Sequence, residues 1–319
     1  MSKPDILVRS AFMPHVDDQL EAEFTLHKSY LADDPQSFIS EVAPKIRGLA
    51  GWGGKVDKAL IDRLPALEVI ANFGVGYDAI DAAYAGTKNI IVTNTPDVLS
   101  EEVADIALGL LISAGRELGA AERHLREGKW EAGDYPLTTS TLRGRKVGIS
   151  GLGRIGKAVA RRVEAMGLDI VYYGRSKQDG VAYQHYSDLR AMAADVDTII
   201  SVLPGGDATH HLFDEAVFNA LGANGIFVNI GRGTSVDETA MIRALENGTI
   251  KNVGVDVFEH EPKVPAELIA IDKAVLLPHV GSASINTRNA MGQLVVDNFK
   301  NWFAKGKALT PVAETPNPD

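Results

Sequence analysis

The chain has 319 residues, of which 45% are hydrophobic, and 32 Lys and Arg against 42 Asp and Glu give a formal net charge of −10. This length predicts about two domains, and the apolar content excludes a disordered chain. The sequence has no cysteine, which excludes disulfides, cysteine-ligated metal centres and thiol nucleophiles. The negative charge argues against a nucleic-acid partner, because phosphates bind to positive surfaces.

The sequence shows no pattern typical of a targeting or membrane-spanning segment. Pro4 and Asp5 precede any apolar run at the start of the chain. The longest apolar stretch, residues 103–115, is interrupted by Asp105 and is too short to cross a bilayer. We therefore expect a cytoplasmic protein without a membrane partner.

Short β-branched runs alternate with helical patterns along the first hundred residues. The runs that we predict to be strands are residues 6–9, 24–26, 48–51, 68–72 and 90–92. Alternation at this spacing predicts a parallel sheet covered by helices on both faces. A long apolar-rich helical pattern then runs from Leu99 to about Gly119, with acidic Glu101 and Glu102 in its first turn.

A second alternating series follows a loop at residues 129–143. Its predicted strands are residues 146–150, 169–173, 198–202, 225–229, 253–255 and 275–277. A last helix is predicted from Ser284 to Lys305, ended by Gly306. The sequence therefore predicts two doubly wound, parallel-sheet α/β domains of the Rossmann or flavodoxin-like kind, with a cleft between them.

A glycine-rich turn at residues 151–156 follows a predicted strand and opens a helix. Gly151 allows the tight turn, Gly153 lets a pyrophosphate approach the backbone, and Gly156 lets the helix pack closely on the strand. The helix N-terminus adds positive potential. This context favours a dinucleotide site over a glycine turn that serves packing alone.

The end of the next strand, residues 169–173, bears on the choice of nucleotide. An NAD site is expected to place a carboxylate about 20 residues after the glycine turn, on the ribose 2′-hydroxyl. The chain instead reads Gly174, Arg175, Ser176 and Lys177. An arginine fork and a lysine suit a 2′-phosphate, so we predict NADPH as cofactor and NADH as a weaker alternative; the other interpretation is a solvated basic loop.

A second glycine turn, Gly74-Val75-Gly76, also follows a predicted strand. Because two dinucleotide sites in one small enzyme would be unusual, we interpret this turn as a nest of N–H groups for a substrate carboxylate. The alternative is a tight strand-to-helix turn without a ligand. Trp52, at the end of the neighbouring strand, is predicted to border the same cleft and supply an aromatic wall.

Three further residues are candidates for catalysis. Arg232 and His279 each lie just beyond a predicted strand, where ligands bind in open α/β sheets. Arginine can hold a carboxylate and polarise a carbonyl, and histidine can donate a proton near neutral pH. Glu261 would favour the charged imidazole. Each residue also has an ordinary interpretation as a surface or loop residue, and spacing alone does not bring them together.

From Val69 to Ser284 the chain resembles the D-isomer-specific 2-hydroxyacid dehydrogenase family. The resemblance rests on five motifs in the same order, which are Gly74 to Asp78, Gly151 to Gly156, Asn229 to Gly233, Asp256 to Pro262, and Pro278-His279. It implies that Arg232, Glu261 and His279 are the catalytic set, and that the backbone of Val75 and Gly76 holds the substrate carboxylate.

The same resemblance implies roles for other residues. Arg154 and Ile155 would contact the pyrophosphate. Val202, Leu203 and Pro204 would line the adenine side of the cofactor. Ile230 and Asp256 would neighbour the nicotinamide.

The resemblance also implies how the chain is organised. Residues 1–98 and 285–319 would form a substrate-binding domain, to which the final helix returns, and residues 99–284 a dinucleotide-binding domain. The family is usually dimeric through its cofactor domain, so we expect a homodimer that uses the long helix after Leu99 and the following loop.

In this chain Gly174-Arg175-Ser176 replaces the ribose-binding acid. In this feature the chain resembles the NADPH-using glyoxylate/hydroxypyruvate reductases of that family. We therefore expect reduction of a small 2-oxo acid to the D-2-hydroxy acid, with His279 as proton donor. Two alternatives stay open: a reductase of aromatic 2-keto acids, such as hydroxyphenylpyruvate or phenylglyoxylate, and a nicotinamide-sensing interaction protein. The second needs a partner-binding tail, for which we expect the residues after Thr310 to be too few.

The remaining histidines include an adjacent pair, His210 and His211. No carboxylate flanks them at a spacing typical of metal ligands. We expect them to be surface or loop residues, and we expect no metal.

Overall fold

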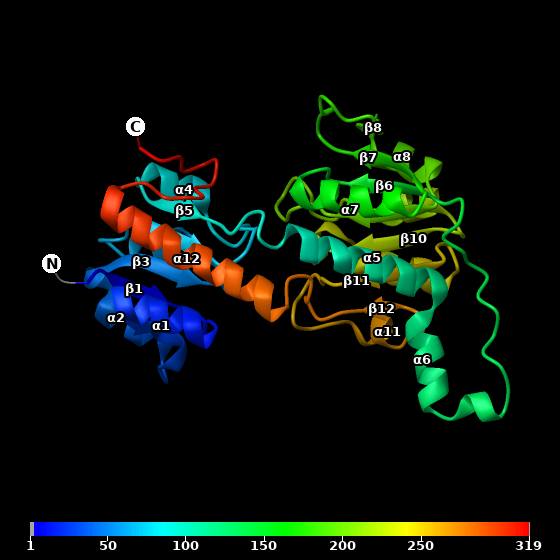
Figure 1. The fold of residues 1–319 in the computed structure, drawn as a ribbon, viewed down its shortest axis with the longest axis horizontal. Coiled ribbons are helices and arrows are strands. Elements are labelled where there is room, and N and C mark those ends of the chain that lie inside the picture. Colours follow the sequence, from blue (N-terminus) through cyan, green and yellow to red (C-terminus); the bar gives the residue numbers. More distant parts are fainter. Residues whose placement is uncertain (1–2, 319) are drawn as a thin grey trace. The chain divides into compact units, whose positions relative to one another are not determined.

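The computed structural model describes residues 3–318. The chain folds into two compact units (Figure 1), one formed by Met1–Leu99 with Ser284–Asp319 and the other by Ser100–Ala283. Each unit is built on a sheet whose paired strands are all parallel. The prediction of two parallel-sheet α/β domains is confirmed.

The first unit has a five-stranded sheet in the order β2-β1-β3-β4-β5. Its strands are β1 (Asp5–Val8), β2 (Thr25–Lys28), β3 (Ile46–Gly51), β4 (Val69–Asn72) and β5 (Ile91–Thr93). In β1, Ile6, Leu7 and Val8 are all fully buried. This burial on both faces is what a continuous apolar run in a parallel sheet predicts.

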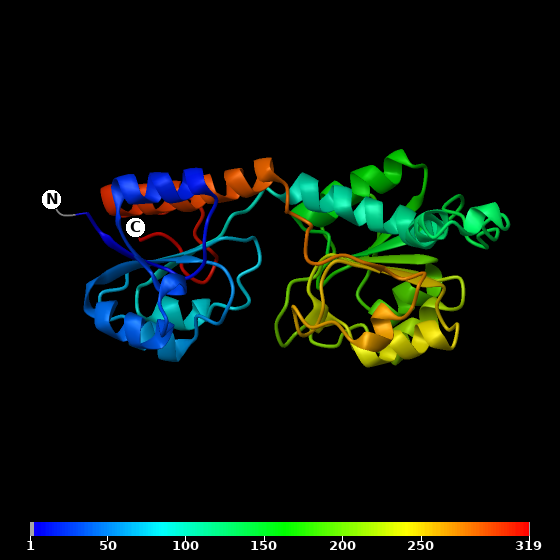
Figure 2. The same cartoon turned by 90° about the horizontal axis from the view of Figure 1, so that it is seen from below.

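Helices cover both faces of this sheet (Figure 2). On one face lie α1 (Pro14–Glu23) and α12 (Ile285–Lys305), and on the other α2 (Pro35–Val42), α3 (Lys58–Asp62) and α4 (Ala82–Thr87). The ends of α12 agree with the prediction. The Ser284 hydroxyl accepts a hydrogen bond from the Thr287 N–H at its start, and Gly306 ends it with a left-handed φ of 67°.

The second unit has a seven-stranded sheet in the order β12-β11-β10-β9-β6-β7-β8. Six of its strands fall within the predicted runs or one residue from them, namely β6 (Lys146–Ser150), β7 (Asp169–Tyr173), β9 (Thr198–Ser201), β10 (Ile226–Asn229), β11 (Asn252–Val255) and β12 (Val275–Leu276). The edge strand β8 (Gln184–Tyr186) was not predicted. It has three residues and no buried one, so it has no apolar run to reveal it.

The helices of this unit also form two layers (Figure 2). The helices α5 (Ser100–Arg116) and α7 (Arg154–Ala165) pack on one face, and α8 (Leu189–Asp195), α9 (Glu215–Leu221) and α10 (Glu238–Glu246) on the other. The short α11 (Ala266–Ile269) precedes β12. Among residues 3–318, no helix has both the length and the hydrophobicity needed to cross a bilayer.

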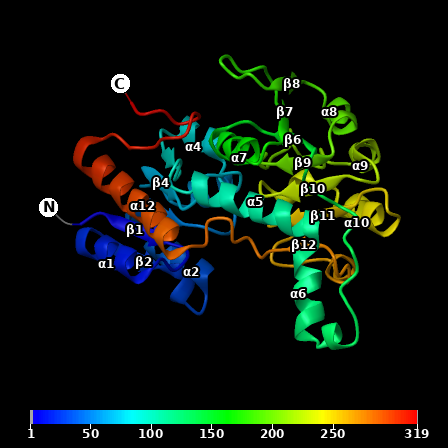
Figure 3. The same cartoon turned by 45° about the vertical axis from the view of Figure 1, so that its right-hand side comes forward.

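The single helix predicted from Leu99 to Gly119 was wrong in its extent. Glu117 adopts a left-handed conformation, with φ 53° and ψ 37°, and separates α5 from α6 (Leu118–Arg126). The helix α6 leads away from α5, and a long loop returns from it to β6 (Figure 3). Within this predicted loop, Lys129–Glu131 form one 3₁₀ turn.

Candidate active site

The glycine turn after β6 has the geometry of a nucleotide cradle. Gly151 has a φ of 95°, which L-residues with side chains rarely adopt. A Cβ on Gly156 would overlap the carbonyl oxygen of Gly151, whereas a Cβ on Gly153 would meet no atom within 4 Å. Gly153 therefore leaves open space over the start of α7, where the N–H groups of a twelve-residue helix favour an anion.

These two glycines give a matched pair of variants. We expect Gly156→Ala to lower the melting temperature by several degrees, because backbone must shift to admit the methyl group. Gly153→Ala is expected to fold with a melting temperature close to wild type and to weaken dinucleotide binding by about tenfold or more, since its methyl group would occupy the open space. Differential scanning fluorimetry and cofactor titration measure both. A Gly153→Ala protein that binds dinucleotide normally would contradict this account of the turn.

The loop after β7 carries the predicted basic residues, and Arg175, Ser176 and Lys177 are all exposed. A neighbouring residue that the sequence did not single out, Gln178, connects this loop to the glycine turn. Its side-chain Nε2 donates a hydrogen bond to the Leu152 carbonyl at 2.8 Å, and its N–H donates to the hydroxyl of Tyr172 at 2.8 Å. The basic loop is therefore held beside the cradle.

Arg232 lies just beyond β10, as predicted, on a tightly packed backbone. A Cβ on Gly231 would overlap the backbone of Leu203, and one on Gly233 would overlap the backbone of Phe258. The Asn229 carboxamide accepts a hydrogen bond from the Gly231 N–H and donates one to the Arg232 carbonyl, both at 3.0 Å. Glycine is therefore required on both sides of this arginine.

Glu261 and His279 form a hydrogen-bonded pair. The distance from His279 Nδ1 to Glu261 Oε2 is 2.8 Å, and Glu261 Oε1 accepts a hydrogen bond from the Phe258 N–H at 3.0 Å. His279 has a left-handed φ of 53°, which is uncommon for a residue with a side chain and often marks a functional position. Nδ1 is engaged, so Nε2 is the ring nitrogen left to act on a substrate.

The electrostatics keep Glu261 ionised. Burial acts to raise the pKa of Glu261. Hydrogen bonds from His279 and the Phe258 N–H oppose this effect, as do the charges of His279 and Arg232. Together they lower the pKa of Glu261 below its ordinary value. The charge of Arg232 thus acts on the same carboxylate that pairs with His279. Arg232, Glu261 and His279 form one electrostatic group in the second unit.

The lowered pKa of Glu261 predicts a pH-dependent contribution to stability. A carboxyl whose pKa is lower in the folded state stabilises the fold above its unfolded pKa, about 4.3, and loses that contribution as the pH falls further. We expect Glu261→Gln to be less stable than wild type at pH 7 by at most about 1 kcal/mol, because the pair is partly exposed. The difference should shrink below pH 4.3. Urea unfolding at pH 7 and pH 3.5 measures it; a difference that grows with acidity would contradict the assigned shift.

Asp256 holds the backbone on which His279 stands. Its Oδ1 accepts a hydrogen bond from the Val280 N–H, its Oδ2 accepts one from the Gly281 N–H, both at 2.7 Å, and its carbonyl accepts the His279 N–H at 2.8 Å. Burial raises the pKa of this carboxyl, against the opposing effect of the two N–H groups. The side chain predicted to neighbour the nicotinamide therefore also anchors the segment that carries His279.

A pocket of about 220 Å³ adjoins the Glu261–His279 pair. Besides this pair, apolar side chains line it, including Phe258, Val264 and Leu276. Such walls suit the apolar part of a small ligand, with the pair as its polar end.

In the first unit, hydrogen bonds to the backbone carbonyls hold the Gly74-Val75-Gly76 turn in place. The Asn72 side chain donates to the carbonyls of Gly74 and Gly76 at 3.0 and 2.9 Å, and the Asn94 side chain donates to the carbonyl of Val75 at 2.8 Å. The side-chain amides of Asn72 and Asn94 therefore bind the carbonyls of this turn. This arrangement is expected of a nest whose backbone N–H groups face an anion.

Trp52 lies on an aromatic cluster of the first unit. Its ring contacts those of Phe12 and Phe73, with centroids 5.3 and 4.7 Å away, and its carbonyl accepts a hydrogen bond from Ser10. Arg9, which follows β1 and which the sequence did not single out, lines a small pocket with Trp52 and Asn72. Its guanidinium donates to the Lys55 carbonyl at 3.1 Å, and burial lowers its pKa.

The chain is similar to several known proteins. The family described as D-isomer specific 2-hydroxyacid dehydrogenase, NAD binding domain, matches residues 108–281. Glyoxylate/hydroxypyruvate reductase A of Arabidopsis thaliana is 41% identical over 98% of this chain and its own full length. Hydroxyphenylpyruvate reductase of Plectranthus scutellarioides is 39% identical over 96% of this chain and 98% of its own.

Among solved structures, the NADPH-dependent glyoxylate/hydroxypyruvate reductase SmGhrB of Sinorhizobium meliloti, in complex with NADP and malonate, is similar over 100% of this chain and 99% of that one. The two have a TM-score of 0.93 and 47% sequence identity. The chain belongs to the D-isomer-specific 2-hydroxyacid dehydrogenase family, and the prediction of that family is confirmed. Its second unit contains the NAD-binding domain.

Proposed function

We propose that this protein uses NADPH to reduce a small 2-oxo acid, glyoxylate or hydroxypyruvate, to the D-2-hydroxy acid. The Glu261–His279 pair carries the proposal, because it presents one imidazole nitrogen for proton transfer while a carboxylate fixes the other. The similarity to glyoxylate/hydroxypyruvate reductases over almost the whole chain supports the substrate class.

In this mechanism NADPH, when bound, supplies the hydride that the carbonyl carbon C2 accepts. His279 donates a proton from Nε2 to the alkoxide oxygen that forms, and Glu261 keeps the ring in position and stabilises its charged form. Arg232 binds the substrate and polarises its carbonyl. The N–H groups of Val75 and Gly76 hold its carboxylate.

The residues around the glycine turn fit the cofactor. The turn would hold the pyrophosphate with the N–H groups of Arg154 and Ile155, and the open space at Gly153 admits it. The residues that would contact the rest of the cofactor are Arg175, Ser176 and Lys177 at the 2′-phosphate, Val202, Leu203 and Pro204 at the adenine, and Ile230 and Asp256 at the nicotinamide.

Arg175 is expected to set the preference for NADPH. Charge-assisted hydrogen bonds contribute about 1.5–3 kcal/mol, so Arg175→Ala should raise KM for NADPH by about 10- to 100-fold and leave KM for NADH within about twofold. Steady-state kinetics with both cofactors measure the ratio. Arg143→Ala, which removes an exposed arginine from a different loop, is the control. Equal effects on both cofactors would contradict the assignment.

Initial rates with the purified protein test the proposed function. Glyoxylate, hydroxypyruvate, pyruvate and phenylpyruvate are each combined with NADPH and with NADH. We expect the highest kcat/KM for NADPH with one of the first two acids. Comparable kcat/KM for the two cofactors, or no turnover of any acid, would contradict the proposal; turnover at enzymatic rates would also argue against a role as a sensor alone.

A second candidate is reduction of an aromatic 2-keto acid. The 39% identity to a hydroxyphenylpyruvate reductase favours it, and the partly exposed ring of Trp52, which packs on buried Phe12 and Phe73, would supply a wall for an aromatic ring. Selective turnover of phenylpyruvate in the same assay would identify this substrate class and retain the roles of Arg232, Glu261 and His279.

We also propose a homodimer formed through the second unit. Apolar side chains on α6 and the following loop are exposed, namely Leu118, Leu125, Trp130 and Leu137, the last at 95%. Light scattering after size exclusion should give the mass of two chains, and a monomer at micromolar concentration would contradict the proposal. The cytoplasmic location stays a prediction.

A further inference from the structure

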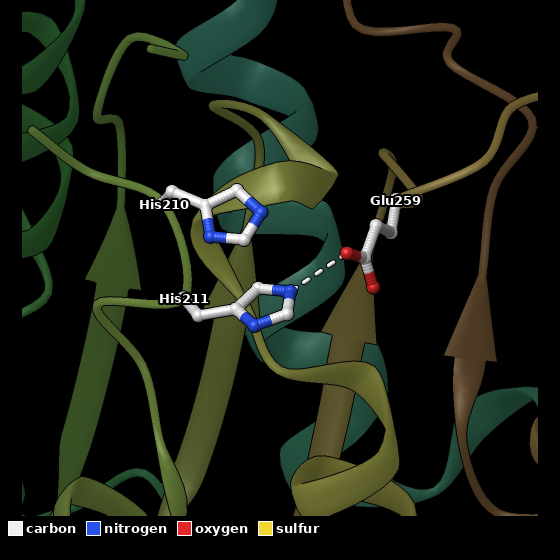
Figure 4. Close-up of side chains that lie close together, drawn as sticks. All are labelled: His210, His211 and Glu259. Atoms are coloured by element: carbon white, nitrogen blue, oxygen red, sulfur yellow. Dashed lines mark hydrogen bonds and ion pairs between the residues drawn. The ribbon is translucent and has the colours of Figure 1, made fainter. Parts of the chain in front are cut away.

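His210, His211 and Glu259 meet in the second unit although 48 residues separate the second histidine from the carboxylate (Figure 4). The two imidazole rings stack with centroids 4.0 Å apart and an angle of 23° between their planes. His211 Nε2 lies 2.6 Å from Glu259 Oε1. One donor atom from each residue lies within 4.8 Å of the other two, and Figure 4 shows these atoms around a common space.

The backbone that carries these donors is fixed by hydrogen bonds. The His211 N–H donates to the Thr234 carbonyl at 3.0 Å, and His211 has a left-handed φ of 48°. The Glu259 N–H donates at 2.9 Å to Oε1 of Glu238, a buried side chain. Two chain segments are thus held beside each other before any ligand binds, which lowers the ordering cost of a shared ligand.

The chemistry of the three donors indicates the ligand class. Two imidazoles and a carboxylate are ligands typical of Zn²⁺ and its neighbours among the transition metals. Mg²⁺ and Ca²⁺ prefer oxygen ligands alone. A neutral organic ligand would need an apolar wall, whereas His210 is exposed and the other two side chains are half-buried.

We propose that His210, His211 and Glu259 bind a divalent transition metal ion such as Zn²⁺, with solvent in the remaining coordination position. A tetrahedral ion about 2.1 Å from each donor holds the donors about 3.4 Å apart. The donor atoms now lie up to 4.8 Å apart, and rotation of the exposed His210 ring brings its nitrogen closer to the other two donors. The 2.6 Å contact between His211 Nε2 and Glu259 Oε1 opens by about 0.8 Å when the ion binds. The sequence analysis expected no metal at His210 and His211, because Glu259 reaches these histidines only through the packing of the fold.

Glu259 lies two residues before Glu261, on the loop that follows β11. A bound ion would therefore connect the His210–His211 turn to the loop that carries a residue of the proposed active site. The two sites use different side chains, so the metal site does not depend on the proposed function. Its ligands can be removed without touching Arg232, Glu261 or His279.

Calorimetric titration of the full chain, first dialysed against a chelator, tests the proposal with Zn²⁺ and with Mg²⁺. We expect one saturable Zn²⁺ site per chain and no Mg²⁺ binding. Three single variants, His210→Ala, His211→Asn and Glu259→Gln, should each weaken Zn²⁺ binding by at least about 100-fold, because even outer-shell partners of a metal are worth 10- to 100-fold. Asparagine is chosen for position 211 because it tolerates a left-handed φ.

Two further variants are controls. His27→Ala removes a histidine paired with Asp5 at 2.7 Å in the other unit, and His279→Gln removes the imidazole of the proposed active site. Both should retain the Zn²⁺ affinity of wild type. Melting temperatures check that every variant is folded. The proposal is overturned if Zn²⁺ does not bind saturably, if the exposed His210→Ala variant binds as well as wild type, or if His279→Gln alone abolishes binding.

Discussion

Replacement of His279 by alanine is expected to lower kcat for hydroxypyruvate reduction by about 10²–10⁴-fold, the usual effect of losing a general acid. The Nδ1 of His279 is engaged by Glu261 at 2.8 Å, so Nε2 is the proton donor that the variant loses. The dissociation constant for NADPH should change by less than about threefold, because no role in cofactor binding is assigned to this ring. Steady-state rates and fluorescence titration with NADPH measure the two effects.

His27→Ala is the matched control. His27 and Asp5 form the same kind of pair, at 2.7 Å, but lie in the other unit and have no proposed role in catalysis. Its kcat should equal that of wild type. A His279→Ala protein with a kcat near that of wild type would exclude His279 as the proton donor, and the proposed mechanism with it.

Replacement of Arg232 by alanine should damage both steady-state constants. Loss of a group that stabilises developing negative charge typically lowers kcat by about 10²–10³-fold. We also expect KM for the oxo acid to rise by about tenfold or more, because the same guanidinium is asked to bind the substrate in its ground state. Rates over a range of oxo-acid concentrations at saturating NADPH separate the two constants.

Two variants sharpen the test of Arg232. Arg232→Lys keeps the charge but loses the planar fork, so its activity should lie between those of wild type and Arg232→Ala. Arg243→Ala removes an exposed arginine from α10 in the same unit and should behave as wild type. A raised KM with unchanged kcat in Arg232→Ala would limit this residue to substrate binding and exclude a role in polarising the carbonyl.

The sequence predicted most of the fold because its signals were local. All eleven predicted strands overlap observed ones, and only the start of β3 and the end of β2 differ from the prediction by two residues. Ser284 and Gly306 marked the ends of α12. The exceptions have local causes as well. The strand β8 is short and partly exposed at a sheet edge. The helix α5 ends before a left-handed Glu117, two residues before the predicted end of that helix.

The candidate site was only partly predictable. The sequence placed Arg232 and His279 beyond strand ends, and the family resemblance grouped both with Glu261 as the catalytic set. The requirement for Gly233 comes from the backbone of Phe258, which is distant in sequence. Gln178 and Arg9 also depend on contacts between separate segments, and Glu259 reaches His211 in the same way. No spacing rule along the chain encodes such contacts.

The most direct test of the proposed function is the product formed from hydroxypyruvate. Purified protein is incubated with hydroxypyruvate and a limiting amount of NADPH, and the glycerate is resolved by chiral chromatography. We expect one D-glycerate for each NADPH oxidised, and an initial rate of glycerate formation about 10²–10⁴-fold lower in a parallel reaction with His279→Ala. Formation of L-glycerate, or oxidation of NADPH without glycerate, would contradict the assignment of this chain as a D-specific 2-oxo acid reductase.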